Sequence, residues 1–384
     1  MKQLLFLMAL LFLASCQDEL YKNPQKEFKS EQGVYVVNKS ALQTFAEEGK
    51  DMNVSGMQVA LAVQDGKSVG ISLETGDQAQ LDAYNKKNQT SYILLPTSMY
   101  EVPSQLVFEP QFTSMDVPIK LKDLKFSMEG KYALPVKIKS SDVNVIPGEN
   151  EAMLVLEQRI NTKVLRFGGT DTEDASMFPS DFKVDQWTME IMINRAYYNQ
   201  NNQALCGTKL VENAGTMDEI YTRFGDVTIK PNQLQIKTGS SQIDVPADKF
   251  SAQPDTWYMI SFVYDGKYNY VYVNGVEVAK QEIRTGPYGL IGFWISGANH
   301  LAREVRFWKT ARTQQEIAST VWTMVNPDDD NLLLYYPLNG KRRDGTEDET
   351  KIWDWSKSGK DLPMPARAAY DDNGGNGYIF PLPE

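Results

Sequence analysis

The chain has 384 residues, of which 42% are hydrophobic and 11% aromatic, so it is long enough to form two domains with sizeable cores. Its 50 acidic and 39 basic residues give a net charge of −11, and a chain this acidic without a basic run repels phosphate backbones, which argues against nucleic-acid binding. The single histidine, His300, excludes zinc sites built on several histidines, and the two cysteines, Cys16 and Cys206, predict no intrachain disulfide if Cys16 is modified.

The first residues have the pattern of a secretory signal over 1–15. An apolar run over 4–13 is too short for a permanent membrane-spanning helix, which needs about 20 apolar residues. The letters LASC at 13–16 resemble a bacterial lipobox, which implies cleavage before Cys16 and lipidation of that residue. An ordinary signal that happens to hold a cysteine is the alternative. The acidic pair Asp18-Glu19 resembles the surface-export signal of Bacteroidetes lipoproteins, which implies the outer face of the cell outer membrane, and the polar stretch 16–32 is then a lipidated tether.

A first folded domain is predicted over 33–158. Short β-rich segments alternate with turn signals such as Asp65-Gly66 and Glu129-Gly130, a spacing typical of an all-β sandwich. One helix interrupts the strands, because Asp77 and Gln80 form a capping-box pattern and Leu81 and Tyr84 share one face. The predicted strands cover 34–37, 57–63, 68–73, 105–108, 117–121, 132–138 and 153–156.

Part of this domain resembles a known family. The stretch LDAYNKKNQTSYILLPTSMYEVP at 81–103 is similar to the Ig-like β-sandwich domains of unknown function in Bacteroidetes lipoproteins, and 131–140 and 144–156 fit the closing half of that family. The resemblance implies a location and neighbouring modules but no active site, so a spacer or docking module is the favoured interpretation.

The clearest fold signal in the second half, 159–384, is the segment DTWYMISFVYDGKYNYVYVNGVEV at 255–278. Asp265-Gly266 and Asn274-Gly275 suit two-residue hairpin turns, and the residues around them are β-branched or aromatic, which predicts a three-stranded antiparallel meander. The first strand is apolar on both faces and is expected to be central. The tryptophan-to-YVNG pattern resembles the core of laminin-G-like, concanavalin A-like jelly-roll modules.

Further stretches resemble the same family in the same order. They are VLRFGGTD at 164–171, WTMEIMIN at 187–194, LAREVRFW at 301–308, QQEI at 314–317, LLLYYPLNG at 332–340 and DWSKSGKDL at 354–362. Arg303 stands where the family usually has aspartate. Other strands are expected at 220–224, 233–236, 241–245 and 289–295, a helix at 313–320, and a loop after 363. The fold class is therefore all-β, with two β-sandwich domains, the second a concanavalin A-like jelly roll.

Several catalytic motifs are missing from the sequence. It contains no Glu-x-Asp-x-x-Glu strand, no Gly-x-Ser-x-Gly, no His-Glu-x-x-His and no phosphate-binding glycine loop, so no catalytic residues are predicted. Two distant carboxylates can still converge in space, which keeps a glycosidase with a non-standard carboxylate pair as an alternative. No resident cofactor or metal site is predicted. The acidic clusters at 169–174 and 328–330 could bind calcium or simply form solvated surface.

The positive functional signal is aromatic. Tyr268, Tyr270 and Tyr272 alternate along one strand, so they share a sheet face where they could stack on sugar rings; packing beneath a neighbouring element is the alternative. The other candidate ligand-binding residues are Trp294, His300, Tyr197, Tyr198 and Asn201, while Trp187, Trp257 and Trp308 are assigned to the core.

By resemblance, the protein is an outer-membrane surface lipoprotein that binds oligo- or polysaccharide within a polysaccharide-utilisation system, near partner glycosidases or a transporter. A protein-binding or adhesion module without sugar affinity is the first alternative, since laminin-G-like folds also serve that role.

Overall fold

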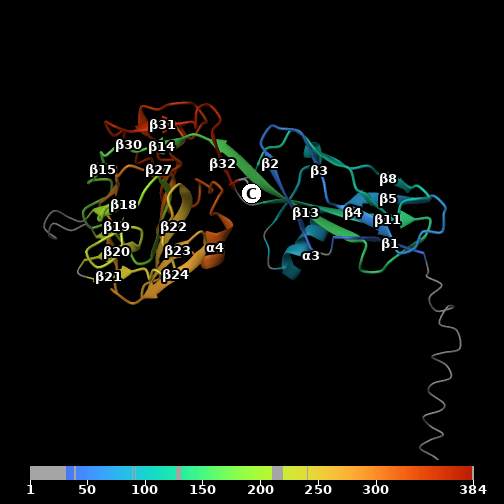
Figure 1. Cartoon of the computed structure of the whole chain (residues 1–384), viewed down its shortest axis with the longest axis horizontal. Coiled ribbons are helices and arrows are strands. Elements are labelled where there is room, and N and C mark those ends of the chain that lie inside the picture. The colour runs from blue at the N-terminus through green and yellow to red at the C-terminus, as the bar shows by residue number, and fades with distance from the viewer. Residues whose placement is uncertain are drawn as a thin grey trace, which may run out of the picture. The chain divides into compact units, whose positions relative to one another are not determined.

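A computed structural model describes residues 32–38, 40–88, 90, 92–126, 131–209, 219–239 and 241–382. The chain forms two compact units, Met1–Arg159 and Ile160–Glu384, and the predicted all-β fold class is confirmed (Figure 1). Residues 1–31, with the predicted signal, Cys16 and nearly all of the tether, lie outside the described residues. None of the helices described is long and apolar enough to cross a membrane.

The N-terminal unit is a β-sandwich. One sheet has the order β12-β1-β4-β9, a second has β2-β13-β11-β5-β8 with β6 beside β11, and β3-β10-β7 form a smaller sheet. Buried side chains from the first two, such as Val34 and Leu154, enclose one core. The strands are β1 (Gly33–Val36), β2 (Leu42–Glu47), β3 (Met52–Val54), β4 (Gln58–Leu61), β5 (Val69–Thr75), β6 (Ile93–Leu94), β7 (Tyr100–Glu101), β8 (Gln105–Phe108), β9 (Ser114–Asp116), β10 (Ile119–Leu121), β11 (Tyr132–Ser141), β12 (Asn144–Val145) and β13 (Glu151–Thr162).

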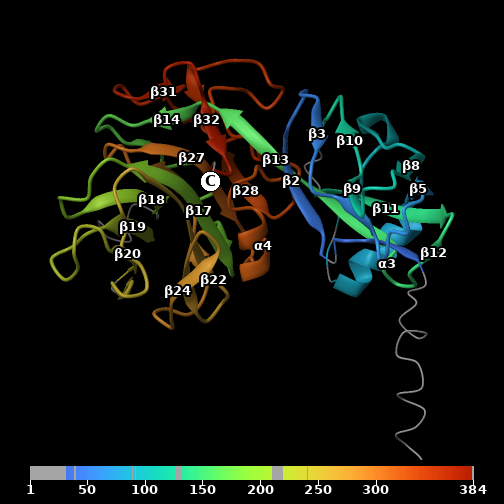
Figure 2. The same ribbon diagram turned by 45° about the vertical axis from the view of Figure 1, so that its right-hand side comes forward.

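The predicted helix of this unit is α3 (Gln78–Asn88), and its capping box is confirmed. The Gln80 amide N–H donates to Asp77 Oδ1 at 3.0 Å, and the Asp77 N–H donates to Gln80 Oε1 at 3.1 Å. Leu81 is buried against Ala133 and Met153, so α3 covers part of β11 and β13 (Figure 2).

The C-terminal unit stacks two antiparallel sheets. A six-stranded sheet has the order β15-β26-β18-β19-β20-β21, and an eight-stranded sheet has β24-β23-β22-β17-β27-β14-β31 with β28 beside β27. Figure 1 shows the six-stranded sheet on one side of this unit and α4 on the other, with the eight-stranded sheet between them. The elements are β14 (Val164–Arg166), β15 (Thr172–Asp174), β16 (Lys183–Val184), β17 (Trp187–Arg195), β18 (Gln203–Lys209), β19 (Ile220–Phe224), β20 (Leu234–Thr238), β21 (Ser241–Asp244), β22 (Thr256–Tyr264), β23 (Asn269–Val273), β24 (Val276–Gln281), β25 (Tyr288–Gly289), β26 (Gly292–Ile295), β27 (Leu301–Trp308), α4 (Gln314–Ser319), β28 (Leu332–Tyr336), β29 (Lys351–Ile352), β30 (Leu362–Pro363), β31 (Ala369–Asp371) and β32 (Tyr378–Phe380).

The predicted meander is confirmed as β22, β23 and β24. Val273 pairs with Val276, which confirms the two-residue turn Asn274-Gly275. Tyr264 pairs with Asn269, so the other connection has four residues, 265–268, and the predicted two-residue turn at Asp265-Gly266 is wrong. The Asp265 carboxylate accepts from the Lys267 and Tyr268 N–H groups, which centres this turn on Gly266 and Lys267. Asn274 and Gly275 have φ values of 48° and 80°, the left-handed conformation that this dipeptide accepts at low cost. β22 lies between β17 and β23 and is buried on both faces, as its sequence predicts.

The outer face of the eight-stranded sheet is covered rather than open. Glu190 on β17 is buried, and its carboxylate accepts hydrogen bonds from Arg312 and from the Trp308 indole, each at 3.0 Å. Burial alone would raise the pKa of Glu190, but the charges of Arg312 and Arg306 lower it. Because Arg312 directly precedes α4, this buried network fixes α4 against the sheet.

Two predictions in this unit need correction. The tail after residue 363 is not a plain loop, because β31 pairs with β14 and β32 pairs with residues 160–162 of β13. Trp257 and Trp308 are buried as predicted, but they lie in satellite clusters on the outer face of the eight-stranded sheet, and only Trp187 belongs to the core between the sheets. Arg303 places its guanidinium 4.2 Å from the centroid of the Phe380 ring and so packs against this tail.

Candidate ligand-binding site

The predicted tyrosine row exists, and other side chains of the protein already contact its rings. Tyr270 and Tyr272 stack with ring centroids 6.1 Å apart, which confirms that they share a face. Tyr272 is only 5% exposed, since it packs with Val263 against Ile317 of α4. The Lys280 ammonium lies 4.6 Å and 4.8 Å from the ring centroids of Tyr268 and Tyr270. Tyr272 therefore packs beneath α4, and the Lys280 ammonium lies over the half-buried rings of Tyr268 and Tyr270.

Trp294 and His300 are also buried. Trp294 is 4% exposed and packs over Gly207, where an added Cβ would lie 2.5 Å from the indole ring. His300 contacts the Phe167 ring, and burial, followed by the charge of Arg195, lowers its pKa to about 3. The imidazole is thus neutral at physiological pH. These two residues support the sandwich end and offer no open surface to a ligand.

The predicted loop with Tyr197, Tyr198 and Asn201 lies at one end of the six-stranded sheet. Tyr197 is 45% exposed, whereas Tyr198 packs edge-on against Phe224 at 4.9 Å. The loop lies against a second loop, because the Asn202 N–H donates to the Gly225 carbonyl at 2.9 Å. Gly225 has φ of 70°, and a Cβ there would lie 3.0 Å from the Asn201 Cα, so glycine permits the close approach.

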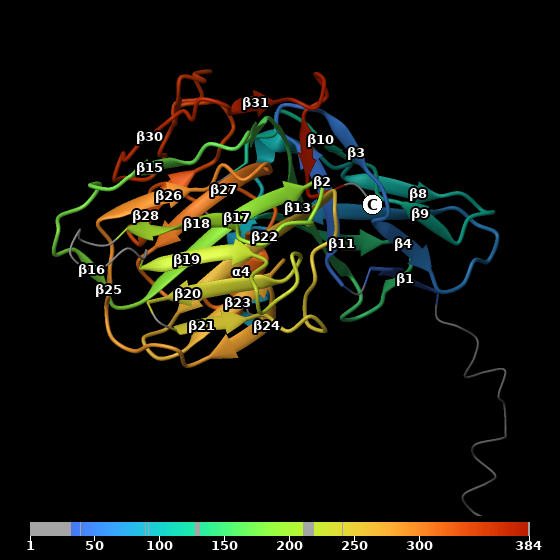
Figure 3. The ribbon, with the colours of Figure 1, turned by 60° about the vertical axis from the view of Figure 1, so that its left-hand side comes forward.

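Beside these loops, polar side chains cover the outer face of the six-stranded sheet. We call this set the polar strip; it consists of Asn202, Tyr221, Arg223, Asp226, Gln235, Lys237, Gln242 and Asp244. Alternation along β19, β20 and β21 places the apolar partners of these residues, such as Ile236 and Ile243, in the core. Figure 3 shows β18–β21 in the foreground.

Arg223 is at the centre of the polar strip. Its Nε and Nη2 donate to Gln235 Oε1 at 2.8 Å and 2.6 Å, and its Nη1 donates to Asn202 Oδ1 at 2.7 Å. Nη2 also pairs with Asp226 at 2.5 Å, and the Tyr221 hydroxyl donates to the same Asn202 oxygen at 2.9 Å. Gln235 is fully buried beneath these groups. The strip is thus a preorganised hydrogen-bonding surface.

Two carboxylates meet at Gln235. Its Nε2 donates to Asp244 Oδ1 at 2.7 Å and to Asp226 Oδ2 at 3.2 Å, so these two oxygens are less than about 6 Å apart. This upper limit includes the roughly 5–5.5 Å between the carboxyl groups of retaining glycosidases, in which one carboxyl group must stay protonated. Burial alone would raise the pKa of Asp226, but hydrogen bonds from the Val227 N–H and Gln235 and the charge of Arg223 lower it. Asp226 is therefore ionised and suited to accept hydrogen bonds from hydroxyl groups.

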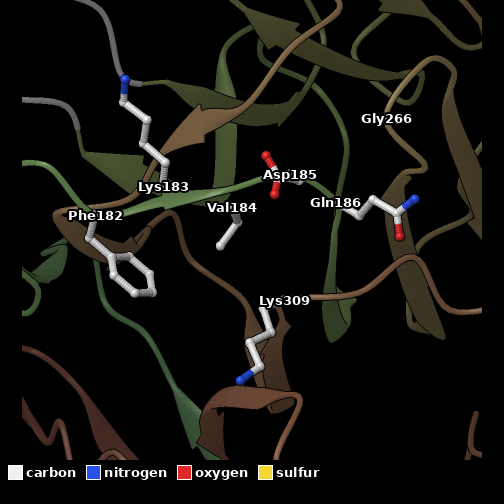
Figure 4. A pocket seen from close by; sticks show the side chains of 7 residues that line it. All are labelled: Phe182, Lys183, Val184, Asp185, Gln186, Gly266 and Lys309. Atoms are coloured by element: carbon white, nitrogen blue, oxygen red, sulfur yellow. The ribbon is translucent and has the colours of Figure 1, made fainter.

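A separate open cavity of about 510 Å³ lies at the edge formed by β16, the β22–β23 turn and the end of β27. Its lining residues are Phe182, Lys183, Val184, Asp185, Gln186, Gly266 and Lys309. In Figure 4, Phe182, Val184 and Lys309 extend into the same space, whereas Lys183 points away. Gln186 Nε2 donates to the Asp265 carbonyl at 2.7 Å, which fixes one wall. The cavity has one aromatic ring and few converging polar groups, so it ranks behind the polar strip as a ligand site.

The acidic clusters considered for calcium have other partners. Asp328 pairs with Arg343 at 2.6 Å, Asp330 pairs with Lys357 at 2.5 Å, and Asp171 accepts from the Gly297 N–H at 2.6 Å. Within the ranges that the structure covers, no group of three or more histidine, cysteine, aspartate or glutamate side chains is placed to hold a metal ion.

Comparison with family models gives two matches. Residues 167–318 match the model of the concanavalin A-like lectin/glucanases superfamily, which covers the strands on which the polar strip lies. The C-terminal unit is a concanavalin A-like domain. Residues 26–145 match a second model, which describes an N-terminal domain. A search of curated proteins finds no match.

Solved structures show the same architecture. A proposed carbohydrate-binding protein from Bacteroides ovatus is 20% identical, covers 88% of this chain and 97% of its own, and superposes with a TM-score of 0.57, which supports a shared fold. A Trypanosoma rangeli sialidase mutant (15% identity, 35% of this chain and 22% of its own, TM-score 0.29) and Bacteroides thetaiotaomicron EndoBT-3987 (17%, 33% and 30%, 0.27) are too distant to support any argument.

The concanavalin A-like domain therefore places its strongest polar constellation on residues that the sequence analysis did not select. Tyr221, Arg223, Gln235 and Asp244 lie on strands that were predicted, and their polar–apolar alternation was the available signal. β18, the strand between β19 and β26, was not predicted, because its sequence QALCGTK has Thr208 as its single β-branched residue and contains a glycine.

Proposed function

We propose that the concanavalin A-like domain binds a glycan along the polar strip. The observation that carries this proposal is the set of preorganised amide, carboxylate and guanidinium groups around the half-buried Tyr221 ring. Sugar hydroxyls pair with such groups. The Tyr221 ring has the Trp294 ring 5.4 Å and the Arg223 guanidinium 5.6 Å from its centroid, so only its remaining exposed surface can pack against sugar C–H groups. The superfamily match supports glycan binding, and so does the Bacteroides ovatus protein, which is itself a proposed carbohydrate-binding protein.

The proposal includes a location and a context. Cys16 carries the lipid, residues 16–32 form the tether, and the protein faces outward from the outer membrane, where it holds oligosaccharide near partner glycosidases or a transporter of a polysaccharide-utilisation system. The LASC sequence and Asp18-Glu19 support this location. Lipid labelling in cells should disappear in Cys16→Ala, and protease added to intact cells should digest the wild-type protein. Full protection of the protein would contradict outward display.

Binding is tested with the full chain in detergent on a broad glycan array, followed by calorimetry on the glycans that bind. Tyr221→Ala and Asn202→Ala should each weaken binding by roughly tenfold or more, because each removes a contact group of the strip. Lys309→Ala, in the cavity of Figure 4, is the matched control and should leave affinity unchanged. Loss of binding in Lys309→Ala alone would move the site to that cavity.

The hydrolase alternative keeps one specific observation, the close pair Asp226 and Asp244. Every glycan that binds is therefore incubated with the protein and assayed for released product. Release that is abolished by Asp244→Asn would establish a glycosidase. A protein that binds no glycan but captures a partner protein would establish the adhesion alternative.

A further inference from the structure

We infer that the polar strip selects uncharged, hydroxyl-rich saccharides and rejects chains that carry carboxylate or sulfate groups. This inference rests on the proposed glycan-binding function and names the class of ligand for that site. It follows from the charges on this face, from the number of Arg223 N–H groups that are already hydrogen-bonded, and from the Asp244 carboxylate, which forms no ion pair with any described residue.

The charges of the described strands on this face balance. Among the residues that the structure describes there, Arg223, Lys237 and Lys209 provide three positive charges, and Asp226, Asp244 and Glu173 provide three negative charges, so these six charges sum to zero. Lys209 pairs with Glu173 at 2.9 Å, and Arg223 pairs with Asp226 at 2.5 Å. Lys237 is the cation of this face for which no ion pair with a described residue is found, and the Asp244 carboxylate, which also has none, lies on the neighbouring strand β21. An acidic sugar would therefore meet one available cation beside one uncompensated carboxylate.

Arg223 has no free pair of adjacent N–H groups with which to bind an anion in a bidentate manner. A guanidinium has five N–H groups, and four of them already point to Gln235, Asn202 and Asp226. A bidentate contact with a carboxylate or sulfate needs two N–H groups side by side. One remaining N–H suits a single hydroxyl oxygen.

The carboxylate of Asp244 also favours an uncharged ligand. It accepts from Gln235 at 2.7 Å, from Gln242 at 3.1 Å and 3.3 Å and from the Thr228 hydroxyl at 3.4 Å, and none of the described cations forms an ion pair with it. Its uncompensated charge repels a ligand anion, whereas its oxygens can exchange the longer of these contacts for hydrogen bonds from sugar hydroxyls. The strip therefore favours hydroxyl donors and opposes anions.

The test compares matched glycans with the full chain: methyl-esterified against de-esterified polygalacturonate, and one oligosaccharide with and without a terminal sialic acid or sulfate. The neutral member should bind roughly tenfold or more tightly. Its affinity should change less than about twofold between low and high salt, because no ion pair forms. In Asp244→Asn the preference should shrink, and Asp248→Asn, an exposed acid after β21, should leave it unchanged.

Equal or tighter binding of the acidic member by the wild-type protein would overturn this inference and leave glycan binding intact. Binding of neither member across the array would overturn the proposed function and this inference with it. If Asp244→Asn fails to fold, the wild-type ratio and its salt dependence still decide the question.

Discussion

Removal of the guanidinium at the centre of the polar strip should cost both stability and binding. Arg223→Met keeps the aliphatic stem but leaves the fully buried Gln235 Oε1 without its two donors, and an unsatisfied buried acceptor costs about 1–3 kcal/mol. Loss of the partly exposed pair with Asp226 adds about 0–1 kcal/mol. The Asn202 side-chain oxygen still accepts the hydrogen bond from the Tyr221 hydroxyl in this variant and so keeps one donor. The expected decrease in the free energy of unfolding is therefore about 1–4 kcal/mol.

Urea denaturation followed by tryptophan fluorescence measures this loss directly, because all seven tryptophans lie after residue 160 and report on the C-terminal unit alone. Arg166→Met, which removes the more exposed guanidinium paired with Asp371, is the control and should cost about 1 kcal/mol or less. Glycan affinity should fall only in Arg223→Met. If the two variants lose equal stability and both keep full glycan affinity, the network is not the organised surface described above.

Three further predictions follow from the same structure. The NMR signals of the single histidine should show no protonation between pH 5 and 8, and an NMR titration midpoint near pH 6.5 would contradict the burial of His300. The free energy of unfolding should fall as pH drops from 6.5 toward 3, because the unfolded chain binds a proton that the folded chain excludes. Gly207→Ala should lower the urea midpoint by the equivalent of about 1–3 kcal/mol, since its Cβ would lie 2.1 Å from the Ile220 carbonyl oxygen, and an unchanged midpoint would refute this packing. A chelator should leave glycan affinity unchanged, because Asp328 and Asp330 pair with Arg343 and Lys357, and affinity restored by calcium after chelation would refute this.

Much of the fold was predictable because its signals are local. Asn274-Gly275 specifies its turn through its own conformational preferences, and the Asp77–Gln80 capping box depends on two residues only three apart. Asp265-Gly266 predicted the presence of the other turn but not its centre, which lies at Gly266-Lys267. The tail strands were not predictable in this way. Tyr378–Phe380 forms a strand because residues 160–162 offer an edge, and that partner lies more than 200 residues away.

The site was harder to predict, because aromatic residues alone do not reveal what covers them. Tyr272 and Trp294 suit sugar stacking by type, but Ile317 covers the first and the second packs over Gly207, and both contacts are tertiary. Asn202 lies beside Arg223 because β18 pairs with β19, and Asp244 lies beside Gln235 because β20 pairs with β21. Polar alternation on neighbouring strands was the signal that could have located it.

The most direct test of glycan binding on the polar strip is a crystal structure of the full chain with a glycan that the array identifies. We predict that the sugar lies over Tyr221 and hydrogen-bonds to Asn202 and Asp244. A sugar seated instead in the cavity lined by Phe182 and Lys309, or on the Tyr268 and Tyr270 rings, would contradict the central claim.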